Sequence, residues 1–293
     1  MPSRPGPAPA LPLDAHLHTD ISHDADVPID VYAALAREAS VAEIAITDHL
    51  DFHARDPNFA LADFGRRERM VREAAERWDG RPLVRFGVEI TYESGLEDQI
   101  RAYLAGHDYD YTIGSIHISD RRPLHRRSAA QWCAGKTHRE ASAWYWDEVE
   151  AAIRSGLFDA LGHLDVVKRW MVEHLGPFEY ERHADIYDRM LRTLLDTGTA
   201  LEVNSSGLRQ PAREMYPPPV VVERFRELGG QRVVAGSDAH RSHHFGFALG
   251  EAYRAIENAG FDRLFFRRGN GGPVVVEFGE ALAGATAGGE AGT

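Results

Sequence analysis

Val233-Val234-Ala235-Gly236-Ser237-Asp238-Ala239-His240 joins an apolar run to two side chains of types that commonly bind metals. The run Val233 to Gly236 is so apolar that it predicts a buried strand, and Asp238 and His240 follow at its end. Residues i and i+2 of an extended segment point to the same side. The D-x-H pattern therefore directs a carboxylate and an imidazole at one point, just beyond the end of a strand.

The same arrangement occurs near the start of the chain, where His16-Leu17-His18 follows the apolar run Leu11 to Leu13. An H-x-H pair at a strand end places two imidazoles on one face, which is a common metal-binding geometry. Two surface histidines would give the same letters, so this pair is ambiguous by itself. Asp14 lies close enough in the sequence to orient one of the two rings through a hydrogen bond.

Further ligand-type residues follow other apolar runs. His49 ends Thr47-Asp48-His49, Glu89 ends the run from Leu83, and His117 and His163 each follow a glycine-containing apolar stretch. Taken singly, these residues also fit a turn, an acid at a helix start and two buried histidines. Their repeated position at strand ends favours a pocket that binds several metal ions. The candidate metal ligands are His16, His18, His23, His49, Glu89, His117, His163, Asp238 and His240.

The hydrophobic pattern alternates short strand-like runs with longer helical stretches. Seven strand-then-helix units predict an α/β fold with a parallel sheet, and such units can close into a barrel. The active site of a (β/α) barrel lies at the C-terminal ends of its strands, where the candidate ligands fall. The expected strands are Leu11–Ala15, Glu43–Thr47, Leu83–Val88, Tyr111–Ile116, Ala160–Leu164, Ala200–Asn204 and Arg232–Ser237. The expected helices are Pro28–Ala39, Asp63–Trp78, Leu96–Ala105, Arg139–Ser155, Phe178–Asp196, Pro218–Leu228 and Gly246–Ala259.

No shift in composition marks a second domain. We expect a flexible leader at residues 1–10, a single barrel domain at 11–279 and a disordered tail at 280–293. The segment Arg121 to Lys136 is basic and lacks periodicity, which predicts a long loop. Pro273 to Phe278 is an eighth short apolar run, and we expect it to pack at the barrel edge.

Composition limits the possible functions. A chain of 293 residues with 43% hydrophobic residues fits a soluble domain with a full core. It has no run of about 18 apolar residues that would span a membrane and no apolar signal-peptide stretch, so we expect a cytoplasmic protein. The single cysteine, Cys133, excludes an internal disulfide framework and Cys-based zinc sites.

The formal net charge is −12 with histidines neutral. This argues against a surface that holds nucleic acid by its phosphate backbone. A small anionic substrate remains compatible, because bound cations can invert the local field.

The motifs HLH, TDH, VE, SIH, GH and SDAH, in this order, resemble the PHP (polymerase and histidinol phosphatase) superfamily over roughly Leu11 to Gly260. The resemblance implies a distorted (β/α)7 barrel that holds two to three divalent metals, with zinc, manganese and iron all suitable. It implies that His16, His18, Glu89 and Asp238 hold one metal, that Glu89, His117 and His163 hold a second, and that His23, His49 and His240 hold a third. Many members have SDG where this chain has Ser22-His23-Asp24, so Asp24 is an alternative to His23.

Further stretches resemble the histidinol-phosphatases of this superfamily. They are Gly156 to Lys168 (GLFDALGHLDVVK), Leu201 to Arg209 (LEVNSSGLR) and Glu214-Met215-Tyr216-Pro217. The resemblance implies release of phosphate from L-histidinol phosphate in histidine biosynthesis. The chain departs from the pattern after His117, where a basic segment replaces a short hydrophobic stretch containing Trp and Asp.

Two cationic residues are candidate substrate-binding groups. Arg209 follows a loop of small polar residues, where a guanidinium can bind phosphate oxygens with two parallel hydrogen bonds. Lys168, or Arg169 beside it, could also neutralise substrate charge.

Glu89 is the candidate bridge between two cations, and Asp238 or His240 is the candidate to assist the leaving oxygen. The candidate catalytic residues are therefore Glu89, Asp238 and His240.

Three other functions remain alternatives to a histidinol-phosphatase. The first is a related phosphoesterase that acts on a nucleotide or a nucleic-acid end, which the basic loop keeps open. The second is a metal-binding module without activity, which the retention of ligand-type residues disfavours. The third is an amidohydrolase, which also begins with H-x-H but would need a different last-strand pattern.

Overall fold

The computed structural model describes residues 11–52, 63–119, 122–267 and 273–277. The expected leader, 1–10, and the expected tail, 280–293, lie outside the described residues. The described helices are all too short or too polar to cross a lipid bilayer.

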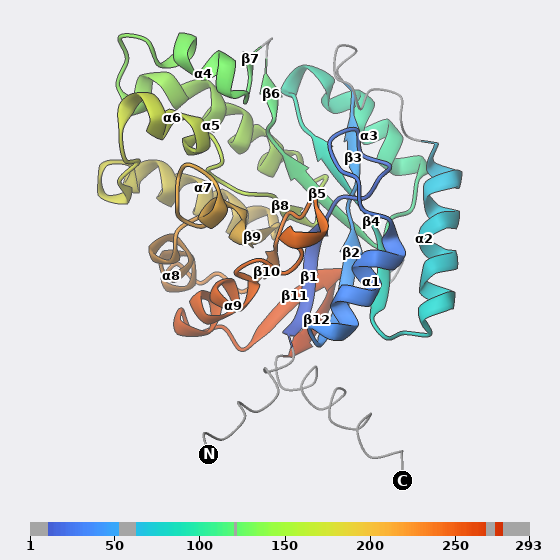
Figure 1. The fold of residues 1–293 in the computed structure, drawn as a ribbon. Coiled ribbons are helices and arrows are strands. Elements are labelled where there is room, and N and C mark those ends of the chain that lie inside the picture. The colour runs from blue at the N-terminus through green and yellow to red at the C-terminus, as the bar shows by residue number, and fades with distance from the viewer. Residues whose placement is uncertain (1–10, 53–62, 120–121, 268–272, 278–293) are drawn as a thin grey trace.

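Seven parallel strands form a nearly closed barrel, which confirms the predicted fold class (Figure 1). Each barrel strand pairs with the next one along the chain, so the helices between them cross over the outside. A short extra strand, β3 (His49–Asp51), pairs in parallel with the C-terminal end of β4. The barrel strands are β1 (Leu11–Leu17), β2 (Val41–Ile46), β4 (Leu83–Thr91), β5 (Tyr111–Ser115), β8 (Ala160–Leu161), β9 (Ala200–Asn204) and β10 (Val233–Gly236).

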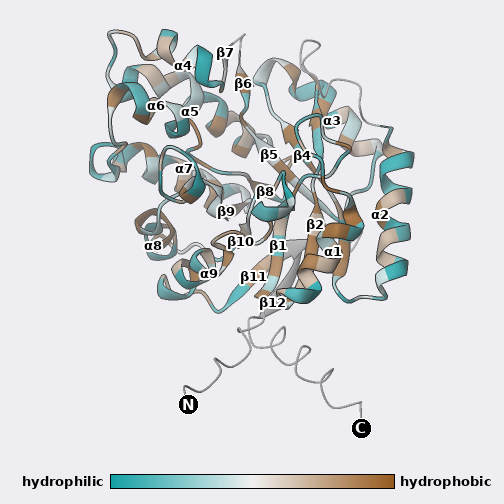
Figure 2. Cartoon of the chain, in the orientation of Figure 1, coloured by the Kyte–Doolittle hydropathy of each residue, from teal (hydrophilic) through white to brown (hydrophobic). Residues whose placement is uncertain are grey.

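Helices form the outer layer around the strands. Hydrophobic residues gather on the strands, whereas hydrophilic residues line the outside of helices such as α2 (Figure 2). The helix ends follow local sequence: Thr137 and Glu140 form a capping box at the start of α5, and Gly156 ends that helix in a left-handed conformation. The helices are α1 (Ile29–Glu38), α2 (Phe64–Trp78), α3 (Glu97–Gly106), α4 (Arg126–Cys133), α5 (His138–Ser155), α6 (Lys168–Leu175), α7 (Ala184–Thr197), α8 (Pro219–Glu227) and α9 (Leu249–Asn258).

The barrel closes where β1 meets β10. These strands share no regular ladder, but Leu17 and Ala239 form a parallel bridge and the His18 amide donates to the Ala239 carbonyl at 3.0 Å. The buried hydroxyl of Tyr32, on α1, donates toward the carbonyl oxygens of both His18 and Ala239, at 2.9 and 2.8 Å. The first and last parts of the barrel are thus held together at the residues that carry the H-x-H and D-x-H motifs.

The prediction that Arg121 to Lys136 is a long loop was wrong. Arg126–Cys133 forms α4, and β7 (Arg122–Pro123) pairs with β6 (Ile118–Ser119). Helix α4 is short and begins with two arginines, which hid its periodicity. Its residues Ala129, Trp132 and Cys133 are buried at helical spacing, and the helix contacts α6.

The apolar run from Pro273 forms β12 (Pro273–Glu277), which pairs antiparallel with β11 (Arg263–Arg267). These two strands make a separate small sheet, and β11 contacts β10. Helix α6 and strands β3 and β11 were not expected from the sequence, because each is too short to display a clear period.

The seam between β1 and β10 gives a stability prediction. Tyr32→Phe removes the hydroxyl shared by the His18 and Ala239 carbonyls, so we expect a loss of about 1–2 kcal/mol of unfolding free energy. Denaturant unfolding measures this loss. Tyr180→Phe, at a partly exposed tyrosine in the turn Tyr180–Arg182, is the control. Equal unfolding midpoints for Tyr32→Phe and the wild type would contradict a role for the hydroxyl in closing the barrel.

Candidate metal centre

Eight of the nine candidate metal ligands come from distant parts of the sequence and meet at the C-terminal end of the barrel. The parallel pairing of β3 with β4 places His49 directly beside Glu89. His16 lies in β1, His49 in β3 and Glu89 in β4, whereas His18, His117, His163, Asp238 and His240 lie within a few residues after the ends of β1, β5, β8 and β10.

Glu89 lies at the centre of this cluster, with 1% of its side chain exposed. Its Oε2 atom is 3.0 Å from His49 Nδ1. The same oxygen is 3.4 Å from His16 Nε2 and 3.4 Å from His18 Nε2. One carboxylate oxygen therefore faces three imidazoles.

The second oxygen of Glu89 faces a different set of groups. Glu89 Oε1 accepts a hydrogen bond from Ser115 Oγ at 2.6 Å. It lies 2.9 Å from His163 Nε2 and 3.4 Å from His117 Nε2. A carboxylate that presents its two oxygens to separate imidazole sets is suited to bridge two cations.

Asp238 and His240 complete the cluster on the β10 side. Asp238 Oδ1 lies 3.5 Å from His18 Nε2, 3.9 Å from His16 Nε2 and 3.4 Å from His240 Nδ1. Four groups have ligand atoms that all lie within 4.8 Å of one another: His18, His49 and His240; His16, His18 and Asp238; His16, Glu89 and His163; and His49, Glu89 and His117. The groups share residues, as expected of a multi-metal site.

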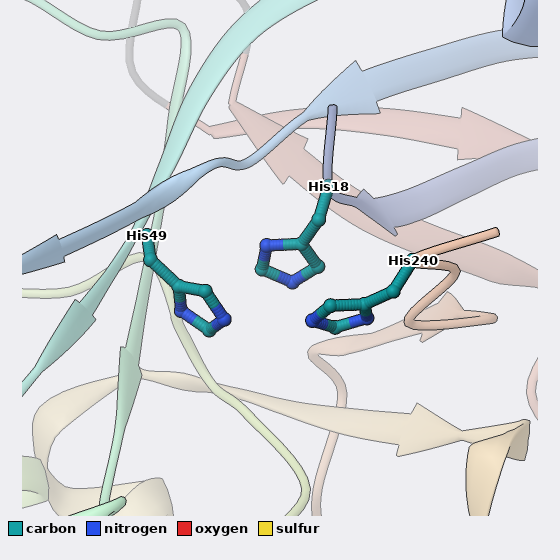
Figure 3. Close-up of side chains that lie close together, drawn as sticks. All are labelled: His18, His49 and His240. Atoms are coloured by element: carbon teal, nitrogen blue, oxygen red, sulfur yellow. The ribbon is translucent and has the colours of Figure 1, made fainter. Parts of the chain in front are cut away.

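The rings of His18, His49 and His240 turn toward one another (Figure 3); His18 directly follows β1, His49 lies in β3, and His240 lies in the segment after β10. The ring centroid of His18 lies 4.2 Å from that of His49 and 4.1 Å from that of His240. Asp24 Oδ2 lies 3.6 Å from His49 Nε2 and 3.3 Å from His240 Nε2. The structure thus adds a carboxylate to this histidine group.

His23 is the predicted ligand that the structure does not bring to the cluster. Its side chain is 41% exposed and belongs to none of the four ligand groups found among the described residues. Its neighbour Asp24, the alternative ligand, is the residue that faces His49 and His240. Asp48 has a structural role in the preceding turn, because its carboxylate accepts hydrogen bonds from the hydroxyls of Thr19 and Ser22.

The buried donor atoms fit divalent metals. His16 Nε2 and both ring nitrogens of His18 are buried and have no hydrogen-bond partner in the described structure. Buried polar atoms without partners are costly, and coordination to a cation would satisfy them. Imidazole and carboxylate donors suit zinc, manganese and iron.

Glu202, on β9, orients two of the candidate ligands. Its Oε1 lies 2.6 Å from His16 Nδ1, and its Oε2 accepts a hydrogen bond from the His163 amide at 2.6 Å. We expected Asp14 to orient a ring, but its Oδ1 accepts from the Ser237 amide at 2.8 Å and so joins β1 to the segment after β10. Sequence reasoning missed Glu202, although a lone acid in a strand of otherwise apolar residues, Leu201–Val203, was the available signal.

Burial and neighbouring charges shift the pKa values of the side chains in the cluster. Burial alone would raise the pKa of Glu89, but the surrounding imidazoles, His16 first, hold it well below its usual range. Burial, with the nearby rings of His240 and His49, holds the pKa of His18 well below its ordinary value. Burial also lowers the pKa of His117 to about 4. The lowered pKa values of His18 and His117 favour the neutral ring, which is the form of imidazole that binds metals. Against the effect of burial, Glu202 and Glu89 raise the pKa of His16, and Glu89 and Asp24 raise the pKa of His49.

Two features of the backbone make room for this cluster. A Cβ atom at Gly236 would lie 2.5 Å from the Cβ of His16 and 2.7 Å from Glu202 Oε1, so only glycine fits there. His163 and Asp238 both adopt positive φ angles, of 24° and 53°. Such conformations are uncommon for residues with a side chain and concentrate at functional sites.

A pocket of about 580 Å³ opens beside Asp24, Asp238 and His240. It is lined on its other sides mainly by basic residues, which sets it apart from the acidic chain as a whole. The cationic residues among them are Arg126, Arg169, Arg209 and Arg241.

Arg209 and Arg169 face this pocket together. Arg209 donates to the carbonyl oxygens of Ser237 and Asp238 at 2.8 and 2.6 Å, and so fixes the segment that carries Asp238. Burial lowers its pKa from the ordinary value, and the charge of Arg169 acts in the same direction. The Nε atom of Arg169 is buried and has no hydrogen-bond partner in the described part of the chain. Two adjacent guanidinium groups in one pocket favour an anion between them.

Lys168 does not line the pocket. Its side chain is 0% exposed, and its ammonium lies 2.8 Å from Asp165 Oδ2 and 3.0 Å from Glu214 Oε1. It also donates to the Met215 carbonyl at 3.1 Å. The three hydrogens of the ammonium are matched by three protein acceptors, and Arg169 is the neighbouring cation that faces the pocket.

Curated relatives match nearly the whole chain. A probable histidinol-phosphatase of Deinococcus radiodurans is 32% identical over 261 residues, which cover 87% of this chain and 96% of the relative. A histidinol-phosphatase of Lactococcus lactis is 24% identical over 259 residues, covering 86% of this chain and 93% of the relative.

A solved structure has the same fold. It is the crystal structure of histidinol phosphate phosphatase from Lactococcus lactis, complexed with zinc, L-histidinol and phosphate. It superposes with a TM-score of 0.80 at 22% identity and covers 88% of this chain and 97% of the solved one. The PHP domain family matches residues 14–206, which include the candidate ligands from His16 to His163 and the orienting Glu202. The chain is therefore a member of the PHP domain family.

Proposed function

We propose that this chain is a cytoplasmic, metal-dependent phosphomonoesterase that hydrolyses L-histidinol phosphate to L-histidinol and phosphate, a step of histidine biosynthesis. The observation that carries the proposal is a buried cluster of imidazoles and carboxylates that opens directly into an arginine-lined pocket. The first part suits divalent metals and the second suits a phosphate group. The identity of the relatives supports the choice of histidinol phosphate among phosphomonoesters.

The metals would be held by the overlapping ligand groups. Glu89 would join two of them, with His16, His18 and Asp238 on one side and His117 and His163 on the other. His49 and His240, with Asp24 in the place expected for His23, would hold a third. When bound, such metals lower the pKa of water toward 7 and stabilise charge on the phosphoryl oxygens.

The pocket residues would bind and orient the substrate. Arg169 and Arg209 would donate hydrogen bonds to the phosphate oxygens, which aligns the phosphorus with the metal ligands. Asp238 and His240 line the same pocket, and their side chains lie 3.4 Å apart. Because both side chains are also candidate metal ligands, this pair would assist the leaving alcohol oxygen by orienting a water that supplies the required proton.

Phosphate release measured together with metal content tests the proposed function. We expect the purified protein to contain divalent metal and to release phosphate from L-histidinol phosphate. Treatment with EDTA should abolish the activity, and Zn, Mn or Fe should restore it. Activity that survives complete removal of metal would exclude the proposed mechanism. A metal-bound protein that hydrolyses no phosphoester would instead support a metal-binding module.

A nucleotide is the second candidate substrate, because Arg126 from the basic segment lines the pocket. Arg126 Nε is paired with Glu173 Oε2 at 2.9 Å, so this charge is already partly neutralised. Assays of 3′,5′-bisphosphorylated nucleosides and short single strands, run beside L-histidinol phosphate, separate the two. A higher kcat/KM on the nucleotides would overturn the choice of L-histidinol phosphate.

A variant of Glu202 tests whether this carboxylate orients the candidate ligands His16 and His163. Glu202→Gln keeps the size of the side chain but weakens its hold on His16, so we expect metal affinity to fall by roughly 10- to 100-fold. Titration of the metal-free protein with zinc measures this change. Glu251→Gln, on the exposed side of α9, is the control. Unchanged zinc affinity in Glu202→Gln would mean that His16 does not depend on this carboxylate.

Arg169 tests the phosphate pocket. Arg169→Ala should raise KM for the substrate by roughly 10- to 100-fold, because a hydrogen bond to a charged group contributes about 1.5–3 kcal/mol. Metal content should stay at the wild-type level, since in the described part of the chain no hydrogen bond or ion pair joins Arg169 to a candidate ligand. Arg254→Ala, at an exposed arginine of α9, is the matched control. A wild-type KM in Arg169→Ala would remove this arginine from the proposed phosphate site.

A further inference from the structure

Lys168 connects the three segments that carry the phosphate pocket. It is the first residue of α6, directly before Arg169. Its ammonium contacts Asp165, which lies two residues after His163, and it reaches Glu214 and Met215 in the segment that follows Arg209. The same buried group therefore contacts the neighbourhoods of a candidate ligand and of both pocket arginines.

The segment around Met215 is itself tied to the barrel. Asn204, the last residue of β9, and Tyr216 exchange two backbone hydrogen bonds, at 2.9 and 3.0 Å. The 3-10 turn Ser205–Arg209 lies between these two residues in the chain. Lys168 Nζ also lies 5.3 Å from the centre of the Tyr216 ring. The loop that carries Arg209 (residues 205–215, the Arg209 loop) is thus closed at its base by the hydrogen bonds between Asn204 and Tyr216. The side chain of Lys168 links it to α6.

The burial of Lys168 gives this link its strength. An ammonium that is 0% exposed must keep its partners, because an unpaired buried charge is very costly. Movement of α6 away from the Arg209 loop would separate the ammonium from Glu214 and Met215. The cost of that separation opposes a change in the spacing between Arg169 and Arg209.

We propose that Lys168 is a positioning residue that sets the spacing of Arg169 and Arg209 for a phosphate group, without touching the substrate itself. The proposal rests on the proposed phosphatase function, because it concerns the same pocket. It replaces the role that the sequence predicted for Lys168, direct binding of substrate. It also explains why a lysine stands beside the pocket arginine and yet is fully buried.

The test compares two variants of the link with one control in the same network. Lys168→Met removes the ammonium, and Glu214→Gln weakens one of its contacts at a carboxylate that is 35% exposed. Tyr187→Phe is the control, because its hydroxyl donates to Asp165 Oδ2 at 2.6 Å, and among the described residues no hydrogen bond joins it to the Arg209 loop. All variants are studied with their metals bound. The binding of inorganic phosphate is measured by calorimetry, together with kcat, KM and the unfolding midpoint.

We expect Lys168→Met to weaken phosphate binding and raise KM by roughly 10- to 100-fold, the size expected for a misplacement of about 1 Å. Glu214→Gln should give a smaller change in the same direction, and it keeps the test valid if Lys168→Met fails to fold. Tyr187→Phe should lower the unfolding midpoint but leave phosphate affinity unchanged. Metal content should be the same in all of them.

Wild-type phosphate affinity in folded Lys168→Met, or in Glu214→Gln where Lys168→Met does not fold, would overturn the inference. An equal loss of affinity in Tyr187→Phe would also overturn it, since the effect would then come from general packing. If the wild-type protein neither binds phosphate nor hydrolyses a phosphomonoester, the proposed function fails first and the inference fails with it.

Discussion

The structure around the site depends on one buried carboxylate. Glu89 is almost fully enclosed, and five imidazole nitrogens lie 2.9–3.4 Å from its oxygens. A carboxylate removed from water needs compensating positive charge, and the imidazoles or the cations that they bind provide it. The imidazoles come from β1 and the residue that follows it, from β3, and from the segments after β5 and β8. The charge on one side chain is therefore compensated only when these parts of the barrel are assembled in register.

The closure of the barrel serves the same geometry. The parallel bridge between Leu17 and Ala239 sets the H-x-H motif of β1 beside the D-x-H motif that follows β10. Tyr32 and Asp14 reinforce this seam by hydrogen bonds to the backbone of the two motif segments. Strands β1 and β10 lack a regular ladder of backbone hydrogen bonds. Side chains from α1 and β1 supply hydrogen bonds at this seam instead, so the positions of the candidate ligands are still fixed.

The barrel strands, and most of the side chains that cluster at their ends, could be predicted because both follow from short stretches of sequence. Apolar runs followed by His, Asp or Glu identify the strand ends, and parallel strands bring their ends together. A short stretch of sequence does not reveal which way a loop side chain points. His23 was therefore expected in the cluster, whereas in the structure Asp24 faces His49 and His240. A short stretch also does not reveal buried partners far away in the chain. Glu202 and the acceptors of Lys168 could therefore be identified only after the fold was known.

The chain has a net charge of −12, yet its pocket collects arginines. These facts are compatible because salt screens charges beyond about 10 Å. The electrostatic potential in the pocket is therefore set mainly by the residues that line it. Most of its arginines already have partners: Arg209 is bonded to backbone carbonyls, Arg126 to Glu173 and Arg241 to the Asp24 carbonyl. Arg169 instead keeps a buried Nε without a partner among the described residues. An incoming anion would satisfy this donor, so the segments that hold Arg169 in place decide how well its guanidinium is aimed at the anion.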